Sequence, residues 1–222
     1  MHLRTRSSRN DDLRAQILHA ALRLFNRKGF HATSVQDIVG EASCSKGAFY
    51  HHFQSKEDLL LVFHETFIQY ELEQAEQALQ GEGGPLDKLR KIAVQLIDSI
   101  ARFRPYVGVF IQERRFLSHE GFAIVKAKRD RYEGIVRGLV EEAIGQGQLR
   151  PDLDPQLFTL AFFGMYNWSY HWFQPNKPLS TEEVAGRLFD FLIDGARSRA
   201  AEGGPERPGR KRRRRPGGPE II

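Results

Sequence analysis

The chain of 222 residues has few of the sequence features that are typical of membrane proteins, secreted proteins and proteins stabilised by disulfides. Its single cysteine, Cys44, excludes an internal disulfide framework. No apolar run reaches the roughly 18 residues that a membrane span requires, and residues 1–10 lack the apolar segment of a signal peptide. The alternation of apolar and polar residues that is typical of strands is almost absent. We therefore expect an all-α protein of a reducing cytoplasm.

Charged residues are distributed unevenly along the chain. Residues 1–56 hold nine Lys or Arg and four Asp or Glu, whereas residues 197–222 hold nine and three. Because the whole chain carries +5, the middle carries −6. A basic head and a basic tail thus flank an acidic body. A head that binds phosphates explains this asymmetry better than a uniformly basic surface does, although a segment this short can also be basic by chance.

Apolar residues recur at helical spacing along most of the chain. Residues suited to capping mark the expected helix ends, namely Gly29, Thr33 with Gln36, Ser45, Ser55, and Ser180 with Glu183. The pattern predicts helices over about 13–28, 33–42, 46–53, 56–80, 86–103, 105–117, 120–145, 155–173 and 180–198. Apolar residues make up 41% of the chain, which is enough to bury a sizeable core.

The second and third expected helices are joined by a tight turn, as in a helix-turn-helix. The second helix of such a pair enters a major groove, so its N-terminal end needs small or polar side chains. Gly47 and Ala48 remove bulk there, Lys46 can reach a base edge or a phosphate, and the helix N-terminus adds N–H donors. Phe49 and Phe53 are four residues apart, so both face the core and fix the helix from below.

Residues 13–60 resemble the DNA-binding domain of the tetracycline-repressor (TetR) family, above all over 33–39 (TSVQDIV) and 45–60 (SKGAFYHHFQSKEDLL). One departure is Cys44, where valine is common and where a small buried cysteine also fits. The resemblance implies DNA contacts at Thr33, Ser34, Ser45, Lys46, Gly47, Tyr50, His51 and Lys56. We add Ala48 to this predicted DNA-binding surface, because its small side chain lets the backbone come close.

The resemblance also implies an N-terminal three-helix DNA-binding domain followed by a helical ligand-binding and dimerisation domain. We divide the chain into a flexible basic N-terminus (1–9), the helix-turn-helix domain (10–55), the ligand-binding and dimerisation domain (56–198) and a disordered basic tail (199–222). In the family, the last two helices pack against those of a second copy. Apolar and small residues available for a homodimer contact, or alternatively for an ordinary core, are Leu157, Leu160, Ala161, Gly164, Trp168, Val184, Leu188, Phe191, Leu192 and Gly195.

Aromatic residues between positions 158 and 173 exceed what one buried helix face requires. The block 164–173 (GMYNWSYHWF), followed by 175–185, resembles a TetR subgroup that controls fatty-acid, sterol or aromatic-acid breakdown and responds to acyl-coenzyme A thioesters. Arginine suits the phosphates of coenzyme A, although each basic side chain can instead belong to a solvated helix face. The expected ligand-binding residues are Phe103, Tyr106, Phe110, Arg114, Arg129, Tyr132, Phe162, Tyr166 and Trp168.

The expected function is a repressor that binds a palindromic operator as a dimer and is released by a small molecule, best matched by an acyl-CoA. The alternatives are a helix-turn-helix protein that responds to another apolar ligand, of the multidrug type, or one without an effector, such as a nucleoid-type protein or an adaptor. No nucleophile–base pair and no phosphate loop is legible, so we expect neither an enzyme nor a cofactor. His51 and His52 lack a second ligand cluster, so no metal site is expected. The run 209–215 can bind DNA phosphates or be dispensable.

Overall fold

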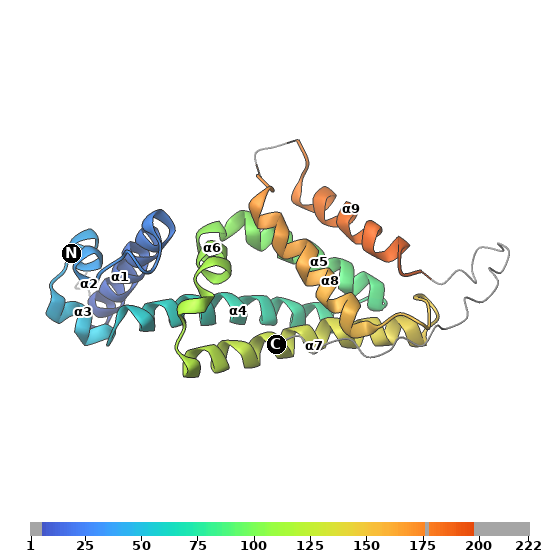
Figure 1. Cartoon of the computed structure of the whole chain (residues 1–222), viewed down its shortest axis with the longest axis horizontal. Helices are drawn as coiled ribbons and strands as arrows, with labels where there is room; N and C mark the ends of the chain where they lie inside the picture. The colour runs from blue at the N-terminus through green and yellow to red at the C-terminus, as the bar shows by residue number, and fades with distance from the viewer. Residues whose placement is uncertain (1–5, 176–177, 198–222) are drawn as a thin grey trace, which may run out of the picture.

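The computed structural model describes residues 6–175 and 178–197, and the side chains from residue 11 onward. In this part of the chain the fold is all-α, as predicted (Figure 1). An isolated antiparallel bridge between Leu149 and Arg197 is the only extended pairing among these residues. The elements are α1 (Arg6–Lys28), α2 (Val35–Glu41), α3 (Lys46–His52), α4 (Lys56–Gln80), α5 (Pro85–Arg102), α6 (Arg104–Gln112), η1 (Arg114–Phe116), α7 (His119–Gly145), α8 (Pro155–Trp168), η2 (Ser169–His171) and α9 (Thr181–Asp194).

Several helices begin or end away from their expected bounds. Helix α1 already begins at Arg6, so residues 6–9, which we expected to be flexible, are helical. The expected helix over 105–117 is wrong at its end, because α6 stops at Gln112 and the chain continues as the short 3₁₀ helix η1. The expected end of the last helix at 198 is also wrong, because α9 stops at Asp194 and the next residues enter the bridge to Leu149. The predicted tail, 199–222, and residues 1–5 lie outside the described residues.

Four of the predicted caps are confirmed. Ser45, Ser55 and Ser180 accept hydrogen bonds from the backbone amides three residues further on, and Ser180 forms a full capping box with Glu183. Gly29 follows α1 in the left-handed region at φ +82°, where a residue without a Cβ is favoured. These caps satisfy backbone groups that a helix end leaves without partners.

The predicted cap of α2 is wrong by one residue. Ser34 is the N-cap, and its side chain accepts a hydrogen bond from Asp37 N at 3.1 Å. The Asp37 carboxylate accepts one from Ser34 N at 2.8 Å. Thr33 does not cap the helix because its hydroxyl donates to the Gly29 carbonyl at 2.8 Å, which closes the preceding turn.

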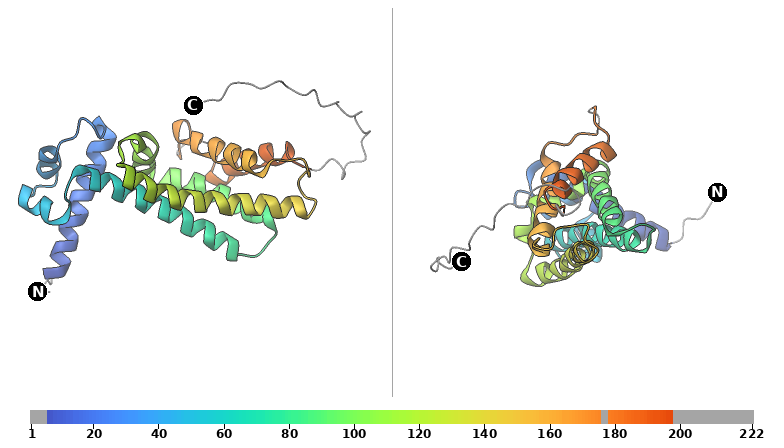
Figure 2. Two further views of the ribbon diagram at one scale, coloured as in Figure 1. Left: turned by 60° about the horizontal axis from the view of Figure 1, so that its bottom comes forward. Right: turned by 90° about the vertical axis from the view of Figure 1, so that its right-hand side faces the viewer.

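Two hydrophobic cores share helix α4, which runs from the N-terminal head of the molecule (α1–α3) into its body (α5–α9) (Figures 1 and 2). The first turns of α4 place Leu59, Leu60 and Phe63 in the core of the head. Further along, Ile68 and Leu72 belong to the core of the body. Each fully buried side chain of this size contributes about 1.5–3 kcal/mol. A single rigid element therefore helps to stabilise both halves of the molecule.

Helix α6 is attached directly to the head. Glu113, which follows α6 and is 8% exposed, accepts a hydrogen bond from the backbone amide of Phe30 at 3.1 Å. The side-chain amide of Asn26 in α1 donates to the Pro105 carbonyl at 3.0 Å. Val109 of α6 is buried in the core of the head. Two hydrogen bonds and an apolar contact therefore join α6 to the head. None of the described helices is long and apolar enough to cross a membrane.

Candidate DNA-binding and effector sites

The recognition helix α3 is held from below by two phenylalanines. Phe49 is fully buried and Phe53 is 4% exposed, with their ring centroids 5.9 Å apart. Ser45 begins the helix by accepting a hydrogen bond from Ala48 N at 3.1 Å. The two rings and the cap hold α3 in place on the head, with its opposite face directed outward. Tyr50, which is 55% exposed, packs edge-on against Phe49.

The outward face of the head collects most of the predicted DNA-binding residues. Gly47 has open space around it, since a Cβ built there would meet only Ser45 Oγ, at 3.8 Å. A DNA backbone or base edge can therefore approach the start of α3 closely. The predicted residues that lie exposed on this face are Ser34, Ser45, Lys46, Gly47, Tyr50 and His51, with Ala48 half-buried among them.

A hollow of about 440 Å³ lies beside this face, between the start of α2 and the start of α4. Ser34, Tyr50 and Lys56 line it, together with His31 and Gln54. Backbone N–H groups at helix N-termini and hydroxyl groups suit the phosphate oxygens of DNA. Sequence reasoning missed His31 and Gln54, because neither lies on an expected helix face.

Two predicted DNA contacts are engaged within the head itself. Thr33 is 1% exposed and its hydroxyl is bonded to Gly29. The Lys56 ammonium donates to the carbonyls of Phe30 at 3.0 Å and Thr33 at 2.9 Å, and it lies 4.4 Å from the centroid of the Phe30 ring. The turn between α1 and α2 is thereby tied to the start of α4. Because these side chains already have partners, the structure gives them a role in positioning the surface.

An ion pair and hydrogen bonds keep the carboxylate of Asp37 charged at the start of α2. The Lys28 ammonium, 2.8 Å away, and hydrogen bonds from Ser34 hold the pKa of Asp37 well below its usual range. Asp37 therefore stays ionised at the N-terminal end of α2, where a negative charge is favourable. Burial lowers the pKa of His52, and the neighbouring His51 and Arg14 lower it further.

The predicted ligand-binding residues do not all meet in one place. Phe103 and Tyr106, at the α5–α6 junction, line a pocket of about 180 Å³ with Thr66, Phe67 and Tyr70 of α4. Sequence reasoning missed the role of these three α4 residues, because their helical spacing also fits an ordinary buried face. The pocket is aromatic on most sides, and the Tyr70 and Phe103 ring centroids are 5.1 Å apart.

Four other predicted ligand-binding residues belong to the interior of the body. Tyr132 packs against Phe163 of α8, with ring centroids 4.9 Å apart. Phe162 and Tyr166 are fully buried, and the Tyr166 hydroxyl donates to the Ala185 carbonyl at 3.0 Å, which joins α8 to α9. The fourth, Phe110, is half-buried and packs against the rings of Phe67 and His64.

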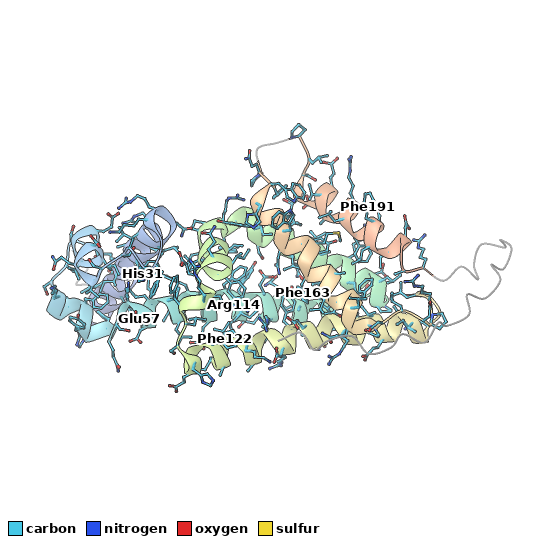
Figure 3. All side chains as sticks on the ribbon, in the orientation of Figure 1. His31, Glu57, Arg114, Phe122, Phe163 and Phe191 are labelled. Carbon is cyan, nitrogen blue, oxygen red and sulfur yellow. The ribbon has the colours of Figure 1, made fainter. Side chains whose placement is uncertain are left out.

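The remaining three lie at the surface of the body. Arg129 is paired with Glu133 at 3.3 Å. Arg114 has no carboxylate partner among the described residues. Its guanidinium lies over the ring of Phe122, near the point where α6 leads into α7 (Figure 3). Trp168 is 63% exposed, so it faces away from the core and from the 180 Å³ pocket.

A capped helix-turn-helix on a basic head, joined by one shared helix to an all-α body, defines the class of DNA-binding transcription regulators. The chain belongs to the tetR family of bacterial regulatory proteins. Residues 17–62 match the family's DNA-binding region, and residues 82–196 match a tetracyclin repressor-like C-terminal domain. The proteins of this family are transcriptional regulators and not enzymes, as we predicted for this chain.

Curated relatives extend over most of the chain. The HTH-type transcriptional repressor KstR2 of Mycolicibacterium smegmatis is 29% identical over 191 residues, which are 85% of this chain and 91% of that protein. The transcriptional regulator AcuR of Cereibacter sphaeroides is 30% identical over 152 residues, which are 66% of this chain and 69% of that protein. Both relatives are regulators of transcription, so this chain is a DNA-binding transcriptional repressor of the family.

Solved structures share the fold. PfmR from Thermus thermophilus superposes with a TM-score of 0.74 at 33% identity, covering 80% of this chain and 97% of that one. AibR, solved in complex with isovaleryl coenzyme A and operator DNA, superposes with a TM-score of 0.73 at 29% identity, covering 82% and 98%. The fold is thus common to transcriptional regulators, one of which was solved with a ligand and operator DNA.

Proposed function

We propose that this repressor binds a palindromic operator as a homodimer and is released by a small molecule, an acyl-CoA thioester. The observation that carries the proposal is the aromatic pocket on α4, the helix that also completes the core of the head. A ligand there touches α4, which contributes side chains to both cores. It can shift the balance between a DNA-binding and a released state only by binding one of them more tightly.

The homodimer is supported by an apolar stripe that the single chain leaves uncovered. Leu157, Leu160 and Trp168 of α8 are 65%, 54% and 63% exposed, and Phe191 of α9 is 80% exposed on the outer side of that helix (Figure 3). Exposed apolar patches of this kind mark contact surfaces. Gly164, on the same side of α8, has open space around it, which allows a second helix to approach closely. A twofold dimer also places two recognition helices about 34 Å apart, one turn of DNA.

Not every residue that we assigned to the dimer contact is available for it. Val184 is 3% exposed and belongs to the body's own core, which is the alternative that we gave for this set of residues. Leu188 and Leu192 are half-buried against the same core. The contact therefore rests mainly on α8 and on the outer edge of α9.

Two observations support an acyl-CoA as the effector, namely the similarity to AibR and the two arginines Arg114 and Arg115. AibR, which shares the fold at 29% identity, was solved with isovaleryl coenzyme A. The Lys and Arg side chains of α7 all have carboxylate partners, as Lys128 has in Glu65 and Arg131 in Glu76. Arg114 and Arg115 lie instead over aromatic rings, so their guanidinium groups remain available to a phosphate.

The test combines native mass spectrometry with operator binding. The purified full chain is offered acetyl-, isovaleryl- and octanoyl-CoA, with free coenzyme A as the control. A dimer that retains one acyl-CoA per protomer and loses operator affinity supports the proposal, and the double variant Arg114→Ala, Arg115→Ala should weaken the response at least tenfold. Arg137→Ala, on the exposed face of α7, is the matched control and should leave it unchanged. A monomer, or operator affinity that no thioester alters, contradicts the proposal.

A second candidate is an uncharged apolar effector without coenzyme A. It is favoured by the lining of the 180 Å³ pocket, in which Thr66 and two tyrosines are the only polar side chains and none is charged. In the same experiment, release by a free hydrophobic alcohol or ketone, with no response to any thioester, would support this candidate.

A further inference from the structure

The aromatic walls of the pocket on α4 are already packed in place. The Phe67 ring lies against Phe110 of α6, with the ring centroids 4.9 Å apart. The Tyr106 ring lies edge-on against the buried ring of Phe63, at 5.8 Å. The remaining two aromatic rings of the wall pack against each other. Because packed side chains resist displacement, the width of the pocket is set before a ligand arrives.

The pocket lies where the two cores of the molecule meet. Its Phe67 side chain packs against the core of the body, whereas its Tyr106 side chain packs against the core of the head. A group held between the walls therefore contacts both halves at once. None of the described residues that line the pocket is charged, so a charged group would lose its hydration there without gaining a partner.

The size of the pocket matches one ring. Its volume is about 180 Å³, and a cavity of about 150 Å³ lined by apolar side chains binds benzene. Aromatic rings pack favourably on one another when they are offset or edge-on, so a flat ring can pack against these walls. A fused pair of rings would push apart side chains that already pack on the cores, which is unfavourable.

The rim of the pocket leaves room for the rest of a larger ligand. Thr66 is exposed there, and Phe103 is 36% exposed. A bulky and charged group attached to the ring can therefore remain in solvent. This arrangement suits a molecule with an apolar end and a highly charged end, as an aromatic acyl-CoA has.

We propose that the pocket binds a single six-membered aromatic ring, which is the acyl part of the effector, while the thioester and the coenzyme A lie outside. The inference rests on the proposed acyl-CoA response and specifies the class of acyl group. A linear chain of similar size binds more weakly, because it loses internal freedom on binding and cannot stack on the walls. The pocket thereby selects thioesters of monocyclic aromatic acids.

Three uncharged esters test this selection without DNA and without coenzyme A. ¹⁹F NMR titrations of the full chain compare methyl 4-fluorobenzoate, which has one ring, with methyl 6-fluoro-2-naphthoate, which has two, and with methyl 6-fluorohexanoate, which has none. The benzoate should bind at least fivefold more tightly than either of the others. This comparison uses the native chain and needs no variant.

Two variants check that the ring occupies this pocket. Phe103→Ala removes a half-exposed wall, so it should strengthen binding of the naphthoate at least fivefold and weaken that of the benzoate. Thr66→Phe fills the rim and should weaken the benzoate at least fivefold. Ile124→Ala, at a site 38% exposed on α7, is the matched control and should keep the native order of affinities.

The proposal is overturned if no ester binds, if the naphthoate or the hexanoate binds as tightly as the benzoate, or if either pocket variant behaves like the native chain. Operator release by thioesters without any preference among the esters would overturn this inference alone and leave the proposed function standing. A clear preference for the benzoate, in a protein whose operator affinity no thioester alters, would support the ring site and contradict the proposed effector class.

Discussion

Burial of Glu71 makes the stability of the body depend on pH. Its pKa rises from 4.5 to about 7 in the folded chain. Between these values the folded chain keeps a proton that the unfolded chain has released, so the free energy of unfolding falls as pH rises through this window and stays lowered above it. The shift corresponds to about 3 kcal/mol, since each pKa unit is worth about 1.36 kcal/mol.

Urea unfolding at fixed protein concentration tests this dependence. Glu71→Gln removes the titrating group, so the variant should match the native chain at pH 4.5 and exceed it by about 2–3 kcal/mol at pH 8. Glu73→Gln, exposed two residues further on, should show no such difference. A stability gain of equal size at both pH values would mean that packing, and not protonation, is responsible.

Lys56 shows how one residue can be predicted as a DNA contact and be engaged elsewhere. Its ammonium is bonded to the carbonyls of Phe30 and Thr33. Lys56→Met should therefore lower operator affinity through the shape of the head and leave the slope of log K against log salt unchanged. Lys46→Met, on the recognition helix, should reduce that slope by about 0.9 for each protomer. An equal reduction in both variants would show that Lys56 does contact a phosphate.

The caps show what the sequence can predict at this scale. The caps at Ser45, Ser55 and Ser180 join residues three positions apart, so local spacing identifies them. Over 33–37, however, the letters TSVQD contain two overlapping boxes, one from Thr33 and one from Ser34. Only the position of the Gly29 carbonyl, which takes the Thr33 hydroxyl, decides between them. The partners of Lys56 depend on the fold in the same way.

At the scale of elements, the contact between α6 and the head depends on one carboxylate. Glu113→Ala would leave the buried Phe30 amide without an acceptor, which costs about 1–3 kcal/mol. Amide hydrogen exchange should then speed up in the turn between α1 and α2 and stay unchanged in α7. Glu120→Ala, in the exposed first turn of α7, is the control. If the turn exchanges as slowly in the Glu113 variant as in the native chain, the hydrogen bond is not what holds the two elements together.

The same carboxylate explains an error in the expected elements. Residues 105–117 contain no internal proline, and their only glycine, Gly108, lies within α6, so periodicity predicts one continuous helix. The structure ends α6 at Gln112, just before Glu113 turns to the head. The long helices α4, α5 and α7 were predictable because each is periodic over many turns. The pocket between α4 and α6 was only half predictable, since helical spacing does not show which face a neighbouring helix leaves open.

At the scale of the whole molecule, the apolar stripe on α8 and α9 should decide the oligomeric state. Trp168→Glu with Phe191→Glu places two charges in the proposed contact, where they would be desolvated against a second copy. Sedimentation should then show a monomer at micromolar concentration, with operator affinity reduced at least a hundredfold. Ile124→Glu, at a site 38% exposed on α7, should leave both unchanged. A dimer that persists in the double variant would place the contact elsewhere.

The sharing of α4 sets where this protein can be cut and recombined. Leu59, Leu60 and Phe63 complete the core of the head, so a fragment that ends at residue 55 lacks part of its own interior. A hybrid regulator that borrows the DNA specificity of this chain must therefore carry the first two turns of α4 along with α1–α3. The border of the head therefore lies inside α4 and not in the turn that precedes it. A hybrid joined at that turn would lose the α4 side chains that complete the core of the head.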